Sequence, residues 1–229
     1  MIYAMSDIHG YYQDYIMMLN KIKLQREDTL LILGDVIDRG EGGIRILLDM
    51  LERPNVRPFL GNHEAMMYFV LKELRKEESE QNKKWLKDMM ADWTVYNGGE
   101  VTYREYLKLD AGTKDKVFQY LSEFDIYDEL TVAGKRFFIS HAGLGNFKKR
   151  KPLENYRLTD FIETRMDYNK TYFPDKIMLS GHTPTFTIDR KYGGKIYQKN
   201  NHIVIDCGVA YKGSLGCICL DTMEEFYVP

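Results

Sequence analysis

The sequence predicts an α/β fold with four layers, in which helices cover the outer faces of two facing mixed sheets. Three observations support this architecture. The first sixty residues alternate strand-like and helical segments in a βαβαβ order, and strand-like segments dominate after residue 126. The apolar run Ile203-Val204-Ile205 is typical of a strand that is buried on both faces. So many strands imply two sheets rather than one.

The spacing of apolar residues defines the elements of the first sixty positions. Tyr12, Ile16 and Leu19 recur at the spacing of an amphipathic helix. Short apolar runs between glycine- and aspartate-containing segments have the composition of strands. The expected elements are a strand at 1–6, a helix at 11–23, a strand at 29–33, a helix at 43–52 and a strand at 55–60.

The stretch from about 64 to 124 differs from the segments before it. It is rich in charged residues and low in β-branched ones, and Trp85, Trp93 and many methionines lie three or four residues from other apolar positions. This pattern predicts helix throughout, as an insertion into the α/β fold. The charged part from Lys72 to Lys87 is interpreted as a solvated helix face with its connecting turn, in preference to a substrate-recognising surface.

Strands are expected to form most of the remaining chain. Gly193-Gly194 is predicted to be a hairpin turn, because paired glycines favour the turns that join antiparallel strands. The expected strands are 127–133, 136–140, 176–180, 195–199, 203–206, 215–220 and 224–228.

Composition and length indicate one catalytic domain over 1–229. The formal net charge of −2 gives no reason to expect nucleic acid or a membrane as a partner. Three cysteines without framework spacing (Cys207, Cys217 and Cys219) favour a reducing compartment. The first strand begins at the first residue, and no apolar run approaches the length of a membrane span. The expected location is the cytoplasm.

Five short polar motifs each follow an apolar, strand-like run and together hold four of the five histidines. Loops that leave the carboxyl ends of strands meet at one edge of an α/β sheet, so the motifs are expected to form one site. Carboxylate and amide oxygens suit hard divalent metals and imidazole suits borderline ones, which predicts a two-metal site. The motifs are Asp7-Ile8-His9-Gly10, Gly34-Asp35-Val36-Ile37-Asp38-Arg39-Gly40, Gly61-Asn62-His63-Glu64, His141-Ala142-Gly143 and Gly181-His182-Thr183-Pro184.

In order and spacing, these motifs resemble those of the calcineurin-like metallophosphoesterases. The Asp38-Arg39 pair narrows the resemblance to the phosphoprotein phosphatase family in its short, prokaryotic and phage-like form, over residues 1 to about 220. The resemblance implies that the helical insertion covers one flank of the site. It also implies two divalent ions about 3.5 to 4 Å apart that share a water of lowered pKa. Manganese is expected, with iron, zinc, nickel, cobalt and magnesium as alternatives.

The resemblance also implies a ligand set for these ions. Asp7 and His9 would bind the first metal, and Asp35 would bridge the two. The ligands that would complete the second metal are Asn62, His141 and His182.

The resemblance further implies the residues of catalysis. His63 would be the general acid, with Asp38 holding its imidazole in orientation. Arg39 would bind the phosphoryl group through two parallel hydrogen bonds. Arg165 is preferred as the second phosphate-binding arginine, although Glu163 stands where relatives carry tryptophan, and Arg157 is the alternative.

Four further residues have competing interpretations. Glu64 is expected to bind backbone groups, or groups that support the metal ligands, at the start of the following helix instead of a metal. His202 has no acidic or imidazole neighbour in sequence and is interpreted as a surface or structural histidine in preference to a ligand. Tyr211 could contact substrate or pack in the core. Cys207 is expected to be a small buried thiol in preference to a redox sensor.

The predicted function is hydrolysis of phosphate monoesters, with phosphoserine or phosphothreonine in proteins as substrate. The nucleophile would be a metal-activated hydroxide that attacks directly, because no serine or cysteine lies in a nucleophile setting among the motifs. The alternative is a bis(5'-nucleosyl)-tetraphosphatase or another nucleotide phosphoesterase. A non-catalytic module that binds phosphorylated ligands is less favoured, since such a module would be expected to lose ligand residues.

Overall fold

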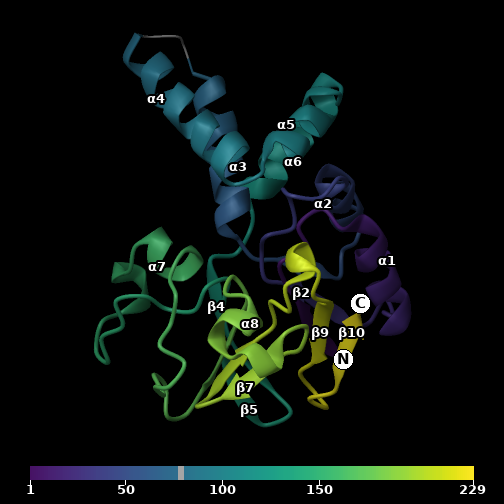
Figure 1. Cartoon of the computed structure of the whole chain (residues 1–229), viewed down its shortest axis with the longest axis vertical. Coiled ribbons are helices and arrows are strands. Elements are labelled where there is room, and N and C mark those ends of the chain that lie inside the picture. The colour runs from purple at the N-terminus through teal and green to yellow at the C-terminus, as the bar shows by residue number, and fades with distance from the viewer. Residues whose placement is uncertain (77–79) are drawn as a thin grey trace.

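Two five-stranded mixed sheets form the centre of the computed structural model, which describes residues 1–76 and 80–229 (Figure 1). In the first sheet β1, β2 and β3 run parallel, and β9 and β10 continue it as antiparallel strands. Both chain termini lie at the β10 side of this sheet (Figure 1). Its order is β10 (Glu225–Val228), β9 (Leu215–Cys219), β1 (Ile2–Met5), β2 (Thr29–Ile32) and β3 (Val56–Pro58).

The second sheet has three parallel central strands with an antiparallel strand at each edge. Its order is β4 (Tyr127–Val132), β5 (Lys135–Ser140), β6 (Ile177–Ser180), β8 (His202–Val204) and β7 (Tyr197–Lys199). Every strand that the sequence predicts is present, and most are one to three residues shorter than expected. The α/β prediction with two mixed sheets is confirmed.

The predicted hairpin turn at Gly193-Gly194 is wrong. The hairpin joins β7 to β8, and its two-residue turn is Asn200-Asn201, since Lys199 pairs with His202. Both asparagines have positive φ angles, 52° and 59°, as a type I′ turn requires and as asparagine tolerates.

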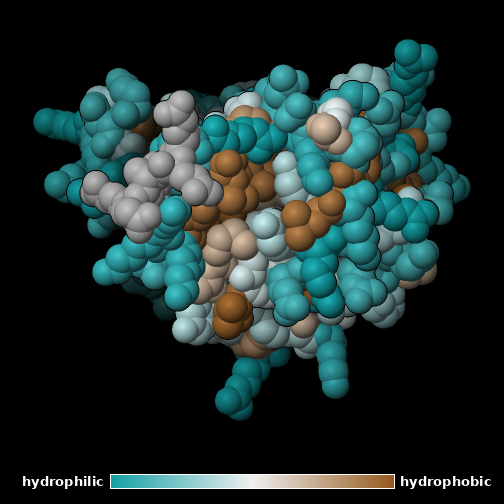
Figure 2. Space-filling model, turned by 90° about the horizontal axis from the view of Figure 1, so that it is seen from above, coloured by the Kyte–Doolittle hydropathy of each residue, from teal (hydrophilic) through white to brown (hydrophobic). Residues whose placement is uncertain are grey.

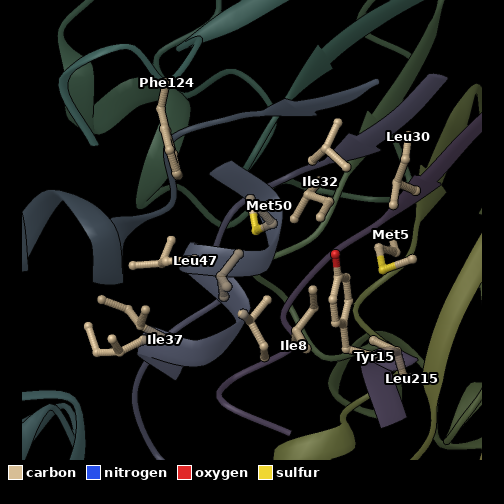
Figure 3. Packing of buried hydrophobic residues seen from close by; sticks show 14 of the residues in the cluster. Met5, Ile8, Tyr15, Leu30, Ile32, Ile37, Leu47, Met50, Phe124 and Leu215 are labelled. Atoms are coloured by element: carbon tan, nitrogen blue, oxygen red, sulfur yellow. The ribbon is translucent and has the colours of Figure 1, made fainter. Parts of the chain in front are cut away.

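Successive side chains along each strand point to opposite faces of the sheet, so each sheet packs on both faces and four layers result. Ala4 and Leu31 point toward the second sheet and pack with Phe137, Leu179 and Ile203 in an apolar layer between the sheets. The intervening residues of β1 and β2 face the opposite way, onto α1 (Tyr12–Lys21) and α2 (Gly43–Leu51), as Figure 3 shows. On the far side of the second sheet, Val204 packs in the cluster that includes α7 (Leu158–Ile162). Each buried aliphatic side chain contributes about 1.5–3 kcal/mol to this packing.

The helical insertion rises above the sandwich as two diverging arms (Figure 1). Residues 77–79 of the stretch predicted to be helical throughout lie outside the described residues. Between the described helices the chain is interrupted around residues 97–99 and 108–110. The insertion consists of α3 (Asn62–Leu74), α4 (Glu80–Ala91), a π-helical turn (Asp92–Tyr96), α5 (Glu100–Leu107) and α6 (Ala111–Ser122).

Seen from above, this side of the molecule carries apolar surface between polar flanks (Figure 2). Exposed apolar side chains on the insertion include Phe69, Trp85, Val95 and Tyr96.

The remaining short helical elements are α8 (Thr185–Ile188) and 3-10 turns at Leu153–Asn155, Arg190–Tyr192 and Val209–Tyr211. Among the described residues, no helix combines the length and apolar character that crossing a membrane requires.

The three cysteines are free and buried. Burial raises the pKa of the Cys207 and Cys217 thiols far above the usual value, so little thiolate exists near neutral pH. We therefore expect none of the three to react with a maleimide in the native protein and all three to react in denaturant, as counted by intact mass. Rapid native labelling of Cys207 would contradict this expectation and revive a redox role.

Candidate metal centre

Each of the five polar motifs leaves the carboxyl end of a parallel strand, namely β1, β2, β3, β5 and β6. The two sheets bring these ends together, so the motifs meet around one cavity of about 140 Å³. His141 is fully buried and lies behind Asp35 and Asn62. The cavity is lined by Asp7, His9, Asp35, Arg39, Asn62, His63, Asn97, Arg165, His182, Pro184, Asp206 and Tyr211.

Asp35 lies at the centre of two groups of potential metal ligands. One group is His9, Asp35 and His63, and the other is Asp35, His141 and His182; within each group the ligand atoms lie within 4.8 Å of one another. The carboxylate reaches toward both, with Oδ1 3.3 Å from His141 Nε2 and Oδ2 3.8 Å from His9 Nε2. This is the place that a bridging carboxylate would occupy.

Asn62 and Asp7 extend these groups. The side-chain oxygen of Asn62 lies 3.2 Å from His141 Nε2 and 3.0 Å from His182 Nδ1. Asp7 Oδ2 accepts hydrogen bonds from the Ser6 hydroxyl and, at 2.9 Å, from the backbone N–H of His182. The structure thus brings together all six residues proposed as metal ligands.

Two imidazoles are oriented by backbone carbonyls. Nδ1 of His9 lies 3.0 Å from the Ile37 carbonyl, and Nδ1 of His141 lies 2.6 Å from the Leu33 carbonyl. These contacts place a ring proton on Nδ1, so that Nε2 is the ring nitrogen that faces Asp35 and could bind a cation. Such an outer hydrogen bond is the usual arrangement for a histidine that binds a metal.

The electrostatics of the cluster fit a divalent cation. Burial, together with the Asp35 carboxylate, raises the pKa of Asp7 to about 6. Burial and the Asp7 carboxylate also hold the pKa of Asp206 well above the usual range. Burial and His141 lower the pKa of His182 to about 3, so its imidazole is neutral. A cation beside these groups would favour the ionised carboxylates and use the neutral imidazoles as ligands.

The motif loops adopt strained backbone conformations. Positive φ is uncommon outside glycine, and it clusters at functional sites where the surroundings enforce it. Six of the ten proposed site residues have positive φ angles: Asp7, His9, Asp35, Asp38, Arg39 and His182.

Glu64 holds the second motif in this conformation. Its buried carboxylate accepts backbone hydrogen bonds from Asp35 and Val36, both at 2.8 Å, and from Gly61 at 3.1 Å. It therefore contacts backbone groups, as the sequence predicted. Burial and the nearby Asp35 carboxylate raise its pKa to about 7.

His63 and Asp38 form a buried pair. His63 Nδ1 lies 2.6 Å from Asp38 Oδ2, which leaves Nε2 facing the cavity, 3.4 Å from the Arg39 guanidinium. Burial lowers the proton affinity of the ring, but the carboxylates of Asp35 and Asp38 outweigh it and raise the pKa of His63. A protonated Nε2 in this place could donate to a leaving oxygen.

The two candidate arginines occupy different places. Arg165 follows α7 in a loop and lines the cavity, as Arg39 does. Arg157 is exposed and forms the N-cap of α7, where its backbone N–H donates to Asp160 at 3.0 Å. The geometry therefore favours Arg165 as a phosphate-binding residue.

The two arginines make a matched pair of variants. We expect Arg165→Ala to lower kcat/KM for a phosphate ester by about 10- to 100-fold, since a desolvated charge-assisted contact contributes about 1.5–3 kcal/mol. Arg157→Ala should leave turnover within about twofold, because an exposed side chain away from such contacts has small effects. Steady-state kinetics on both variants would reverse the assignment if only Arg157→Ala loses activity.

Sequence reasoning missed Asp206 and Asn97, which also line the cavity. Asp206 carries the same signal as the recognised motifs, because it follows the buried strand β8 and lies near a glycine. Asn97 comes from the helical insertion and has no such signal.

Tyr211 is half exposed at the cavity, with the Arg39 guanidinium 5.2 Å from its ring centre, so core packing is excluded.

His202 lies apart from this cluster, as expected. It is buried in β8, its Nε2 lies 2.9 Å from the Lys170 carbonyl, and its ring packs edge-on against Tyr168 and Tyr172. These contacts describe a structural histidine.

The sequence profile of one protein family, described as calcineurin-like phosphoesterase, matches residues 1–208. The chain belongs to the calcineurin-like phosphoesterase family. Membership implies a hydrolase that uses divalent metal ions, which agrees with the imidazole and carboxylate groups around Asp35.

Several known proteins resemble the chain over its whole length. Bis(5'-nucleosyl)-tetraphosphatase PrpE [asymmetrical] of Anoxybacillus flavithermus is 24% identical, over 100% of this chain and 94% of the relative. A crystal structure of a putative diadenosine tetraphosphatase superposes with a TM-score of 0.65 at 18% identity, covering 100% of this chain and 92% of that one. A serine/threonine protein phosphatase from Saccharomyces cerevisiae has a TM-score of 0.59 at 15% identity, covering 100% and 80%. The structural matches support the fold.

Proposed function

We propose that this protein hydrolyses phosphate esters at a centre of two divalent metal ions. The observation that carries the proposal is the convergence of imidazole, carboxylate and amide ligands on Asp35, beside two guanidinium groups. Mixed ligation of this kind suits manganese, and we propose it as the activating metal. The residues proposed to hold the metals are Asp7, His9, Asp35, Asn62, His141 and His182.

Side chains of this protein would bind the phosphoryl group and protonate the leaving oxygen. Two bound cations would lower the pKa of a shared water and so supply hydroxide. Arg39 and Arg165, which both line the cavity, would hold the phosphoryl oxygens through bidentate hydrogen bonds. As the bond from phosphorus to the leaving oxygen breaks, His63 Nε2 would donate its proton to that oxygen, with Asp38 holding the ring.

Direct attack is proposed in preference to a phosphoenzyme. Among the described residues that line the cavity there is no serine, threonine or cysteine. The nucleophile would therefore come from water. A phosphate monoester would yield the free alcohol and phosphate, and a dinucleoside polyphosphate would yield two nucleotides.

Two substrate classes have support. A small cavity flanked by two guanidinium groups suits the single phosphoryl group of a monoester, such as phosphoserine or phosphothreonine in a protein. The name of the full-length relative, an asymmetrical bis(5'-nucleosyl)-tetraphosphatase, supports a dinucleoside polyphosphate.

A direct comparison of turnover would distinguish a phosphoprotein substrate from a dinucleoside polyphosphate. The manganese-loaded protein is given a phosphothreonine peptide or diadenosine tetraphosphate at equal concentration, and release of phosphate or nucleotide is measured. Faster turnover of the peptide would support a protein phosphatase, and faster turnover of the dinucleotide a nucleotide hydrolase. Tight binding of either compound without turnover would contradict the proposed hydrolysis and favour a binding module.

A further inference from the structure

We propose that Trp93, in the helical insertion, is a positioning residue for catalysis that acts through Asp38 on the proton donor His63. The inference rests on the proposed role of His63 and goes beyond it. It assigns the insertion a part in the reaction, in addition to covering one flank of the site.

The indole of Trp93 contacts the acid pair directly. Trp93 is fully buried, and its Nε1 donates a hydrogen bond to Asp38 Oδ2 at 2.9 Å. The same oxygen lies 2.6 Å from His63 Nδ1. Two donors thus converge on one carboxylate oxygen, and together they set the plane in which Asp38 meets the imidazole ring.

The other carboxylate oxygen of Asp38 makes no hydrogen bond to the described residues that could fix the orientation of the group. Asp38 is fully buried, and its Oδ1 has no hydrogen-bond partner among the residues that the structure describes. Without the indole, the carboxylate could turn about its terminal bond and present either oxygen to His63, since that torsion is broad. The Trp93 contact therefore restricts Asp38 to one arrangement.

The insertion also holds the backbone on either side of this carboxylate. The backbone N–H of Asp38 donates to Thr102 Oγ1 at 2.9 Å, and that of Arg39 donates to the Gly98 carbonyl at 3.0 Å. Asp38 and Arg39 have φ angles of 71° and 68°, which are unfavourable for residues with side chains. These two hydrogen bonds supply the constraint that such a conformation needs.

Close approach of the insertion depends on its local backbone. Trp93 lies in the π-helical turn Asp92–Tyr96, a type of turn that is frequent at functional sites. This turn directs Trp93 inward, while Val95 and Tyr96 are exposed. Gly99 packs against the indole, where a Cβ atom would lie 2.2 Å from Nε1. Any larger residue there would displace the tryptophan.

A positioning role has a particular kinetic signature. Proton donation matters most when the leaving oxygen is strongly basic and matters little when the leaving group departs readily as an anion. Misalignment of Asp38 and His63 should therefore slow hydrolysis of phenyl phosphate much more than hydrolysis of 2,4-dinitrophenyl phosphate. A general loss of structure would slow both esters alike.

The test compares Trp93→Phe with Trp85→Phe, the other tryptophan of the chain, which is exposed on α4. We expect Trp93→Phe to lower kcat for phenyl phosphate by about tenfold or more and for the dinitrophenyl ester by less than about twofold, with KM unchanged for both. Trp85→Phe should leave both rates unchanged. An equal fall on the two esters, or no fall, would overturn the proposal.

A second variant and a second measurement keep the proposal testable if Trp93→Phe folds poorly or if wild-type protein hydrolyses neither ester. Thr102→Val removes the acceptor for the Asp38 N–H at nearly constant volume, and it should give the same difference between esters. Proton NMR of the wild-type protein should show the proton shared by His63 Nδ1 and Asp38 at strongly low field. Its resonance should move in Trp93→Phe and stay in Trp85→Phe; an unmoved resonance would contradict the contact regardless of activity.

Discussion

Replacing His63 with asparagine is expected to lower kcat for phosphate monoesters by about 10²- to 10⁴-fold, the range typical of a lost general acid. The imidazole is the group that places a proton donor at the cavity, because its Nδ1 is engaged by Asp38 at 2.6 Å and its Nε2 faces inward. Asparagine keeps much of the side-chain volume and loses the titratable ring. Steady-state kinetics on phenyl phosphate with saturating manganese would measure the effect.

Metal content decides between two roles for His63. His63 also lies in one potential ligand group, with Nε2 3.8 Å from Asp35 Oδ2. A general acid can be removed without loss of metal, so His63→Asn should bind manganese as the wild type does. Asp38→Asn is the matched variant and should show a smaller fall in the same direction. Loss of one metal per chain in His63→Asn would show that His63 is a ligand and reject its role as the acid.

Replacing Asp35 with asparagine should have the second large effect, which is the loss of metal binding together with activity. Its two carboxylate oxygens point to the two histidine groups, 3.3 Å from His141 Nε2 and 3.8 Å from His9 Nε2. An amide offers one oxygen and no charge, so it cannot bridge two cations. We expect bound manganese to fall below two ions per chain and kcat/KM to fall by at least about 10³-fold, because the activated hydroxide would be lost.

Thermal unfolding provides a readout that does not depend on turnover. Metal that binds only the folded state stabilises it by about 2.7 kcal/mol at a hundredfold excess over the dissociation constant. Manganese should therefore raise Tm of the wild type and raise that of Asp35→Asn much less. Asp115→Asn, an exposed site on α6, is the control and should respond as the wild type. Two tightly held ions in Asp35→Asn would refute the bridging role.

Much of the fold and most of the site could be read from local sequence patterns. Strands such as β1 and β2 are short, continuous apolar runs that are buried on both faces, and this signal depends only on neighbouring residues. The site residues Asp7, Asp35 and His182 follow such runs directly. Once the runs are recognised as parallel strands, geometry alone brings their ends to one edge.

The hairpin shows where local signals become ambiguous. Gly193-Gly194 and Asn200-Asn201 both tolerate the positive φ angles of a tight turn. The choice between them depends on which strands pair. Because β8 lies between β6 and β7 in the sheet, the antiparallel connection falls at the asparagines.

The sequence by itself determined the two-sheet fold and the residues expected to surround the metals, because strand periodicity and strand-end motifs are local properties. Only the tertiary structure decided which distant side chains meet. Trp93 donates to Asp38 across 55 residues, and Arg165 rather than Arg157 reaches the cavity. These contacts depend on the direction in which packed helices and loops present their side chains. No spacing along the chain encodes that direction, since it results from burial against the rest of the molecule.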